Sequence, residues 1–174
     1  FIAYSRGDCV IPPVGEMQFT QPPGDVHIKY GYIRGGSQYV VKIASGFYEN
    51  PAIGIPSSQG LMLLFNQNTG QLDAVLLDQG NLTDIRTAAA GALSVKHFAP
   101  KNIQAIGIIG TGTQARHQLI QCAKVSACRE VAVWGRSPDN TSKYIEFAES
   151  MGFRAKMAYS PKTVAENCQV ILTT

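Results

Sequence analysis

The stretch Gly107-Ile-Ile-Gly-Thr-Gly-Thr-Gln-Ala115 decides the fold of the second half of the chain. It contains a GxGxxA motif, Gly110 to Ala115, which follows an apolar run and opens a segment with helical spacing of apolar residues. Strand, glycine-rich turn and helix in this order are typical of a dinucleotide-binding unit. Gly110 permits the tight turn, Gly112 lets the backbone approach a pyrophosphate, and Ala115 lets the helix pack closely on the strand. The alternative is a glycine-rich turn that binds nothing.

The rest of the second half alternates between strand-like and helix-like segments. The expected strands are 105–109, 130–134, 154–157 and 169–173, and the expected helices are 114–125, 141–151 and a short one near Ala165. Such alternation builds a parallel sheet with helical crossovers. Because a complete dinucleotide-binding sheet has about six strands, residues 101–174 are expected to form a truncated Rossmann-type domain with the first four strands only.

The first half has a different pattern, in which short β-type runs are separated by Gly, Pro, Asn and Ser. The expected strands are 14–20, 26–33, 38–45, 61–65 and 72–77, with turns at 34–37 and 66–70. An alanine-rich helix over about 83–98 follows, with Thr83 or Asn81 as its N-cap and Pro100 as its stop signal. The fold class is therefore α/β, with an antiparallel-sheet domain over 1–100 that this helix links to the Rossmann-type domain.

The residues after the second Rossmann strand bear on the choice of cofactor. An NAD-binding chain has a carboxylate near this point, about 20 residues past the glycine motif, which accepts hydrogen bonds from the ribose. Here the chain reads Trp134-Gly-Arg-Ser137. The guanidinium of Arg136 and the hydroxyl of Ser137 suit a 2′-phosphate, so NADP(H) is the predicted cofactor and NAD(H) the alternative. Arg136 as an ordinary solvated loop cation is the competing interpretation.

Two lysines face each other in the predicted hairpin of the first half. If Ile33 lies opposite Gln38, then Lys29 lies across from Lys42, and every apolar residue shares the other face. A slip of one residue would mix the faces, so this register is favoured. Like charges placed opposite each other destabilise a sheet unless water or an anion lies between them. The pair therefore predicts a site for an acid, and two solvated surface lysines are the alternative.

Arg86 adds a third cation, in what we expect to be the first turn of the alanine-rich helix. The helix macrodipole disfavours a positive side chain there, whereas a bound carboxylate would reverse that effect. Arginine grips a carboxylate with two parallel hydrogen bonds, and the helix N-terminus adds backbone donors. Ser57 and Ser58 form a hydroxyl-rich turn before Gly60. Such a turn contacts a ligand or simply lies at the surface, and the sequence leaves both interpretations open.

Composition excludes several classes of protein. The net charge is +3, from 15 Lys and Arg against 12 Asp and Glu, without long runs of one sign, so nucleic-acid binding is not expected. The longest apolar stretches are far shorter than the roughly 20 residues of a membrane span. The four cysteines and three histidines are scattered, which predicts no metal site and reduced thiols in a soluble, cytoplasmic protein. The chain lacks an initiator Met and stops after an apolar run, so we expect a piece of a longer protein.

Taken together, the chain resembles the ornithine cyclodeaminase/mu-crystallin family from about Cys9 onward. The resemblance rests on the glycine motif and five further stretches, of which the second and fourth named here are the most specific: His27-Ile-Lys-Tyr-Gly-Tyr32, Val41-Lys-Ile-Ala-Ser-Gly-Phe-Tyr-Glu-Asn-Pro51, Pro56-Ser-Ser-Gln-Gly-Leu-Met62, Leu82-Thr-Asp-Ile-Arg-Thr-Ala-Ala-Ala-Gly91 and Val133-Trp-Gly-Arg136.

The resemblance implies roles for individual residues. Lys42 and Arg86 would match the catalytic and substrate-binding lysine and arginine of the family, with Arg86 also near the cofactor. Ser57 or Ser58 would match a cofactor-contacting hydroxyl. The remaining cofactor contacts would be Thr113 and Gln114 at the pyrophosphate and Thr174 near the nicotinamide ribose.

The resemblance also implies an NAD(P)-dependent enzyme that moves a hydride at the carbon bearing both nitrogen and carboxylate. Family members cyclise and deaminate ornithine or lysine, reduce cyclic imines, or oxidise alanine, and the first domain would bind the amino or imino acid and form a homodimer through its sheet. The alternative is a mu-crystallin-like, NADPH-binding protein with a hormone-binding or other non-enzymatic role. Two departures from the family matter: its acidic proton donor and acceptor would lie beyond Thr174, and the early strand 14–20 has no arginine.

Overall fold

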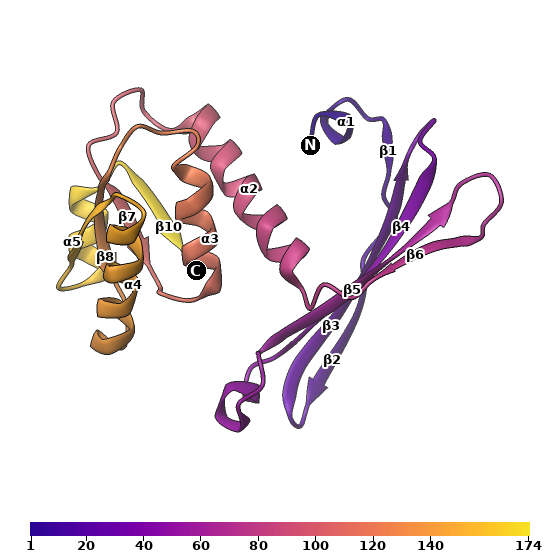
Figure 1. Cartoon of the computed structure of the whole chain (residues 1–174), viewed down its shortest axis with the longest axis horizontal. Helices are drawn as coiled ribbons and strands as arrows, with labels where there is room; N and C mark the ends of the chain where they lie inside the picture. The colour runs from indigo at the N-terminus through magenta and orange to yellow at the C-terminus, as the bar shows by residue number, and fades with distance from the viewer. The chain divides into compact units, whose positions relative to one another are not determined.

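The computed structural model describes all 174 residues and divides them into two compact units, Phe1–Thr83 and Asp84–Thr174. Each unit has a sheet of its own (Figure 1). The division falls near the start of the alanine-rich helix, whereas the sequence predicts it near residue 100. Most of this helix therefore belongs to the second unit. No helix of the structure is long and apolar enough to cross a membrane.

The first unit is an antiparallel sheet of six strands, in which β1 and β2 both pair with β3 and the rest follow in the order β3-β4-β5-β6. Two short helical turns, α1 (Ile2–Ser5) and η1 (Asn50–Ile53), lie outside it. The strands are β1 (Cys9–Val10), β2 (Gly15–Thr20), β3 (Pro23–Ile33), β4 (Gln38–Phe47), β5 (Ser58–Asn66) and β6 (Leu72–Leu76).

The predicted register of the β3–β4 hairpin is confirmed. Lys29 lies opposite Lys42, and Tyr32 lies opposite Tyr39. One expectation is wrong: not every apolar residue lies on the face away from the lysines. Val40 lies on the lysine face, and β5 adds Met62 and Leu64 to it. The lysines therefore lie on a face of mixed polarity, where Lys42 is half-buried and Lys29 is exposed.

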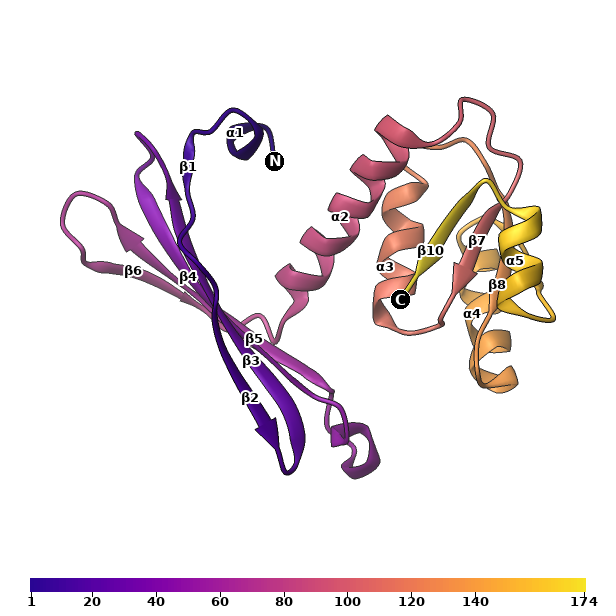
Figure 2. The same cartoon turned by 180° about the vertical axis from the view of Figure 1, so that it is seen from behind.

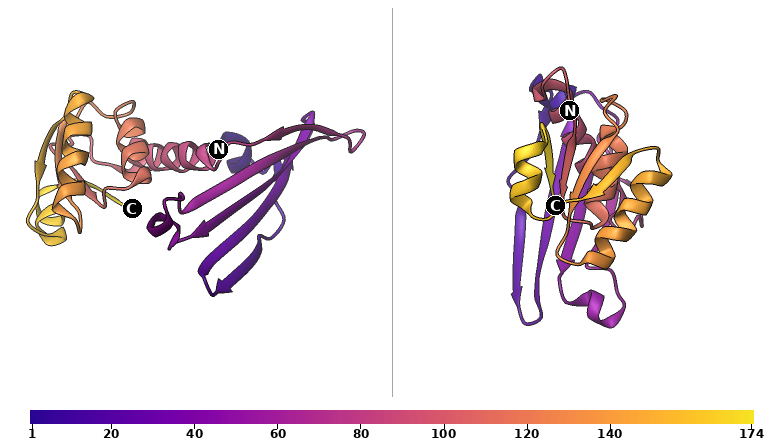
Figure 3. Two further views of the ribbon diagram at one scale, coloured as in Figure 1. Left: turned by 60° about the horizontal axis from the view of Figure 1, so that its bottom comes forward. Right: turned by 90° about the vertical axis from the view of Figure 1, so that its left-hand side faces the viewer.

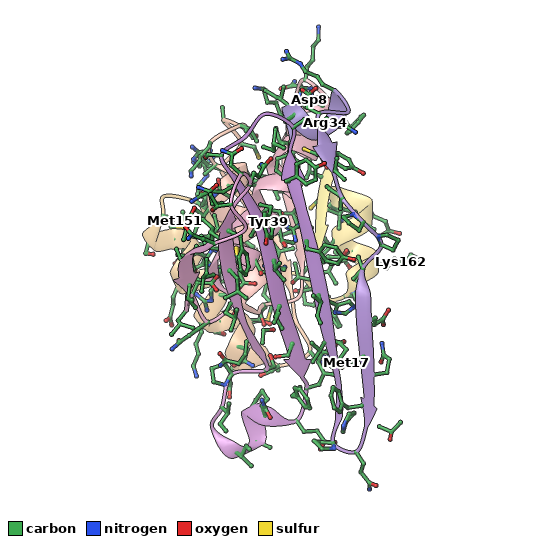
Figure 4. All side chains as sticks on the ribbon, turned by 90° about the vertical axis from the view of Figure 1, so that its right-hand side faces the viewer. Asp8, Met17, Arg34, Tyr39, Met151 and Lys162 are labelled. Carbon is green, nitrogen blue, oxygen red and sulfur yellow. The ribbon has the colours of Figure 1, made fainter.

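The opposite face, which we call the apolar face, bears large apolar side chains from strands β2 to β6. The ring of Tyr39 stacks on that of Phe65, with 4.9 Å between centroids. Met17 and Tyr39, labelled in Figure 4, mark an outer and a central strand of the sheet. Pairing places these residues on the apolar face: Met17, Phe19, Val26, Ile28, Tyr30, Tyr32, Tyr39, Val41, Ile43, Phe47, Leu61, Leu63, Phe65, Leu72 and Val75.

The first unit has no core of its own. Its only fully buried residues are four glycines: Gly24, Gly31, Gly46 and Gly80. Several of the large residues of the apolar face are strongly exposed, among them Met17 at 49% and Val75 at 48%. Contiguous exposed apolar patches mark interaction surfaces, so this face is a candidate interaction surface.

Helix α2 (Asn81–Phe98) begins two residues earlier than the sequence predicts. The Asp78 carboxylate accepts a hydrogen bond of 2.7 Å from the Leu82 N–H at the start of the helix. Thr83 is therefore inside the helix and is not its N-cap. Arg86 consequently lies in the second turn, where the macrodipole and the unpaired N–H groups act weakly. The argument that the helix N-terminus favours a carboxylate at Arg86 is therefore wrong. The positive charge and planar shape of the Arg86 guanidinium still suit a carboxylate.

The second unit is a parallel sheet with strand order β10-β7-β8-β9. Helices α3 and α4 pack on one face and α5 on the other (Figures 2 and 3). Ile106, Ile108 and Leu119 are fully buried in its core. The predicted alternation is confirmed, with these bounds: β7 (Ile106–Ile109), α3 (Thr113–Cys122), β8 (Glu130–Trp134), α4 (Pro138–Ser150), β9 (Arg154–Met157), α5 (Pro161–Asn167) and β10 (Val170–Thr173).

Candidate active site

The glycine-rich loop joins β7 to α3 at the point where the strand order reverses. The chain passes from β7 to β8 on one side, whereas β10 lies on the other side of β7. In open α/β sheets, ligands bind outside the carboxyl ends of the strands at such a switch point. Thr174, which follows β10, donates its N–H to the Ile109 carbonyl over 3.0 Å. The loop and Thr174 therefore lie side by side at this edge, and a contact of Thr174 with the nicotinamide ribose remains a prediction.

Glycine is needed at two positions of the loop, Gly110 and Gly112, for different physical reasons. Gly110 has a φ of +108°, and a Cβ there would lie 2.3 Å from the Thr174 carbonyl oxygen, so the fold itself requires glycine. At Gly112 a Cβ would meet no atom of the chain within 4 Å. Packing of the chain does not explain the second glycine, whereas close approach of an external group to the backbone does. The space beside Gly112 is thus open to an external group such as a pyrophosphate.

Tyr144 of helix α4, a residue that the sequence analysis missed, binds the first turn of α3. The Tyr144 hydroxyl donates a hydrogen bond of 2.9 Å to the Ala115 carbonyl. Both residues are fully buried. Burial raises the pKa of Tyr144, so its hydroxyl remains a neutral donor at physiological pH. Only the fold brings Tyr144 to this turn, and no local sequence signal marks it.

Thr113 and Gln114, which follow Gly112, are the first two residues of helix α3. Their main-chain N–H groups belong to the helix N-terminus, where anions bind. The side chain of Gln114 has another partner: its Nε2 donates to Asp84 Oδ1 over 2.8 Å. Pyrophosphate contact by Gln114 would therefore come from its backbone, and Asp84 is a second residue that sequence reasoning missed.

Arg136 and Ser137 lie directly after β8, as predicted. Arg136 is exposed. Ser137 is the N-cap of α4, and its Oγ accepts a hydrogen bond of 3.3 Å from the Asn140 N–H. Its hydroxyl proton stays available to an acceptor outside the chain. Binding of a 2′-phosphate by these two residues remains a prediction.

The lysine face of the first unit brings Lys29, Lys42 and Ser58 together on one side of one sheet. Lys42 is half-buried, and its Nζ donates to Thr83 Oγ1 over 3.0 Å. Lys29 is exposed. Ser58 pairs with Gly46 on β4, and the carbonyl of Ser57 just before it accepts from the Phe47 N–H over 2.8 Å. Of the two lysines, Lys42 is therefore the more buried one, and Thr83 is one of the groups that bind its ammonium.

Arg86 is exposed on α2 and belongs to the second unit, with the glycine-rich loop. Lys42 belongs to the first unit. The proximity of Lys42 and Arg86 therefore remains a prediction. The structure places Lys29, Lys42 and Ser58 on one face of the first unit. It places Arg86 in the second unit together with the glycine-rich loop.

A sequence model of the ornithine cyclodeaminase/mu-crystallin family matches residues 1–174. The chain belongs to this family. A cyclodeaminase of Sinorhizobium fredii, itself uncharacterized, is 34% identical over 165 residues, which are 94% of this chain and 50% of that protein. The chain spans about half the length of the curated relatives it matches.

Solved structures agree with this membership. The Δ1-pyrroline-2-carboxylate reductase of Thermococcus litoralis, in complex with NADH and L-proline, is 26% identical with a TM-score of 0.92 over 99% of this chain and 53% of that one. An archaeal alanine dehydrogenase, a dimer with bound NAD, is 29% identical with a TM-score of 0.89 over 98% of this chain and 51% of that one. The fold of both units is therefore the family fold.

Proposed function

We propose that this chain is the substrate-binding and cofactor-binding part of an NAD(P)-dependent oxidoreductase or cyclodeaminase acting on an α-amino or cyclic α-imino acid. The observation that carries the proposal is the glycine-rich loop at the switch point. The space beside Gly112 is free of chain atoms, whereas Thr174 occupies the space beside Gly110. The relatives support the substrate class, since one is a cyclodeaminase, one a reductase of an imino acid and one an alanine dehydrogenase.

The roles follow from the chemistry of the side chains. The dinucleotide supplies or accepts the hydride when it is bound beside Gly112, Thr113 and Gln114. Arg86 binds the substrate carboxylate, because its planar guanidinium matches the two carboxylate oxygens. Lys42, held by Thr83, lies near the substrate nitrogen and moves a proton there. Lys29 lies opposite Lys42 and adds positive charge that attracts the acid.

Arg86→Lys in the whole protein tests this function. The charge is kept, but an ammonium cannot form a two-point planar grip. We expect a loss of about 2 to 4 kcal/mol of transition-state stabilisation, or about 30- to 1000-fold in kcat/KM. The assay follows dinucleotide absorbance with cyclic imines, alanine and ornithine as substrates. A variant within twofold of wild type would place Arg86 outside the site, and a wild-type protein that binds the dinucleotide but turns over none of them favours the binding-protein alternative.

We further propose that NADP(H) is the preferred cofactor, although the structural relatives bind NAD or NADH. The support is chemical, since Arg136 and Ser137 stand after β8 where an NAD enzyme has a carboxylate. Titration by fluorescence compares NADPH with NADH for wild type and Arg136→Ala. We expect tighter NADPH binding that Arg136→Ala removes. Equal or tighter binding of NADH by wild type would contradict the preference.

The domain roles and the assembly are proposals of the same kind. The first unit would hold the acid and pair with a second copy through its apolar face, giving a homodimer. The exposed side chains of that face support this pairing, and the alanine dehydrogenase relative is a dimer. The four cysteines are free thiols, which supports a location in the reducing cytoplasm.

A further inference from the structure

Helices α2 and α3 of the second unit are joined by a hydrogen bond between residues 30 positions apart. The Gln114 amide nitrogen donates to the Asp84 carboxylate over 2.8 Å and lies 3.3 Å from the Asp84 carbonyl oxygen. The contact is partly buried. A hydrogen bond to a charged group is stronger than a neutral one, and partial burial protects it from competition by water.

A second contact lies one turn further along α3. A Cβ at Gly91 would lie only 1.9 Å from Oε1 of Gln118, so the side chain of Gln118 occupies the space that Gly91 leaves. Gln118 is four residues after Gln114, and Gly91 is seven after Asp84, so each pair lies on one helix face. The two contacts therefore join α2 and α3 along one face of each helix.

Stability alone does not explain this choice of residues. Oε1 of Gln114 and Oε1 of Gln118 are both buried without a hydrogen-bond partner. A buried acceptor without a partner costs free energy, and an apolar side chain of similar size would fill the same space without that cost. What an apolar residue cannot supply is the directional bond from Gln114 to Asp84.

We propose that the Asp84–Gln114 bond, which we call the helix clasp, sets the position of Arg86 relative to the glycine-rich loop. Asp84 precedes Arg86 by two residues on α2, and Gln114 follows Gly112 by two residues at the start of α3. Asp84 and the Gln114 side chain are then positioning residues that touch neither substrate nor the reacting atoms. This role rests on the proposed function, in which Arg86 holds the acid and the loop holds the dinucleotide.

The reaction makes such a clasp useful. Hydride transfer needs its two carbons about 3 to 3.5 Å apart, and a misplacement of about 1 Å costs on the order of 100-fold in rate. Breaking the clasp loosens Arg86 without touching the loop itself. The effect should therefore appear in kcat and leave dinucleotide affinity nearly unchanged.

The test uses three variants of the whole protein. Asp84→Ala removes the acceptor, and we expect kcat to fall at least tenfold while the NADPH dissociation constant stays within threefold. Asp84→Asn keeps a side-chain oxygen for the same bond and should retain kcat within threefold. Ser94→Ala is the matched control on α2, because its hydroxyl donates only to Ala90 of its own helix, and it should behave as wild type.

A polarity swap makes the test sharper. Gln114→Glu places two carboxylates against each other and should lower kcat as Asp84→Ala does. Adding Asp84→Asn restores a donor and an acceptor with their places exchanged, and should recover at least a third of wild-type kcat. Both substitutions keep the shape of the side chain, so recovery reports the restored hydrogen bond, and an unchanged NADPH dissociation constant distinguishes positioning from a general loss of folded structure.

The outcomes separate the clasp from the proposed function. If wild type turns over its substrate and Asp84→Ala stays within twofold of it, or if the swap fails to recover kcat, the clasp is wrong and the proposed function stands. If wild type turns over no amino or imino acid, the proposed function is wrong and the role of the clasp falls with it. If kcat falls in Asp84→Ala and recovers in the swap, the result supports both the clasp and the proposed function.

Discussion

The two units of this chain bury apolar surface in different ways. The second unit encloses its large aliphatic residues between a parallel sheet and helices on both faces, with Ile106, Ile108 and Leu119 fully buried. The first unit is a single antiparallel layer whose buried positions are glycines. Backbone pairing shapes the first sheet, whereas side-chain packing stabilises the second. The first unit consequently leaves much of its apolar side-chain surface exposed.

This difference also separates the two parts of the proposed site. The glycine-rich loop is held by a core, by Tyr144 behind it and by Thr174 beside it. The lysine face is held by strand register and by the bond from Lys42 to Thr83. Assembly through the apolar face would therefore support the substrate side of the proposed site, whereas the core of the second unit supports the cofactor side without it.

The largest expected effect breaks the proposed assembly. Val41→Glu places a carboxylate on the apolar face, and burying it without a partner should cost about 3 to 5 kcal/mol, which is more than 100-fold in the dimer dissociation constant. Val40→Glu is the matched control, because Val40 is the next residue of the same strand but lies on the lysine face.

Sedimentation of the whole protein measures this contrast. At micromolar concentration, wild type and Val40→Glu should sediment as dimers or multiples of them, and Val41→Glu as a monomer. A monomeric wild type, or a dimer that survives Val41→Glu, would show that the apolar face is covered in some other way.

A smaller effect tests the core of the second unit. Leu119 is fully buried, so Leu119→Ala should lower the free energy of unfolding by about 3 kcal/mol, within the usual range of about 2 to 5 for such a truncation. The matched change in the first unit is Leu77→Ala, at 76% exposure, which should cost less than about 0.5 kcal/mol. Urea unfolding followed by circular dichroism, which reports on both units, measures the two losses, and the fluorescence of Trp134 in β8 identifies the transition of the second unit. Equal losses would mean that the two units do not differ as the structure indicates.

Sequence reasoning succeeded where a local pattern has only one physical solution. The GxGxxA motif between a strand and a helix fixed the loop, and alternation of side chains fixed the pairing of Lys29 with Lys42, because a slip of one residue would have exposed the wrong face. It failed where the partner comes from far along the chain. Tyr144 behind Ala115 and Asp84 beside Gln114 leave no signal in their own neighbourhood.

The start of α2 shows a failure of a more local kind. Thr83 and Asn81 are good N-cap residues, but Asp78 supplies the hydrogen bond to the start of the helix instead. A shift of two residues was enough to move Arg86 out of the first turn. Element type was predictable from the sequence, whereas an argument that depends on one exact terminal residue was not.

The smallest expected effect is a loss of stability in alkali that belongs to the second unit. Burial raises the pKa of the Cys122 thiol from its ordinary value of 9.0 to about 11. A raised pKa means that the folded state keeps its proton while the unfolded chain loses it. The stability that Cys122 contributes is therefore fully present below pH 9 and is lost as pH rises toward about 11. Between pH 8 and pH 10 the loss should be about 1 kcal/mol.

Urea unfolding at these two pH values, with Trp134 as the probe, tests the assignment. In Cys122→Ala the loss should become smaller without vanishing, because the pKa values of Cys168 and Tyr144 are also raised, mainly by burial. Cys9→Ala is the control from the first unit, because Cys9 is only partly buried, and it should keep the full loss. If Cys122→Ala keeps it as well, the alkaline transition does not come from this thiol, and the core of the second unit is more open to water around α3 than the burial of Cys122 implies.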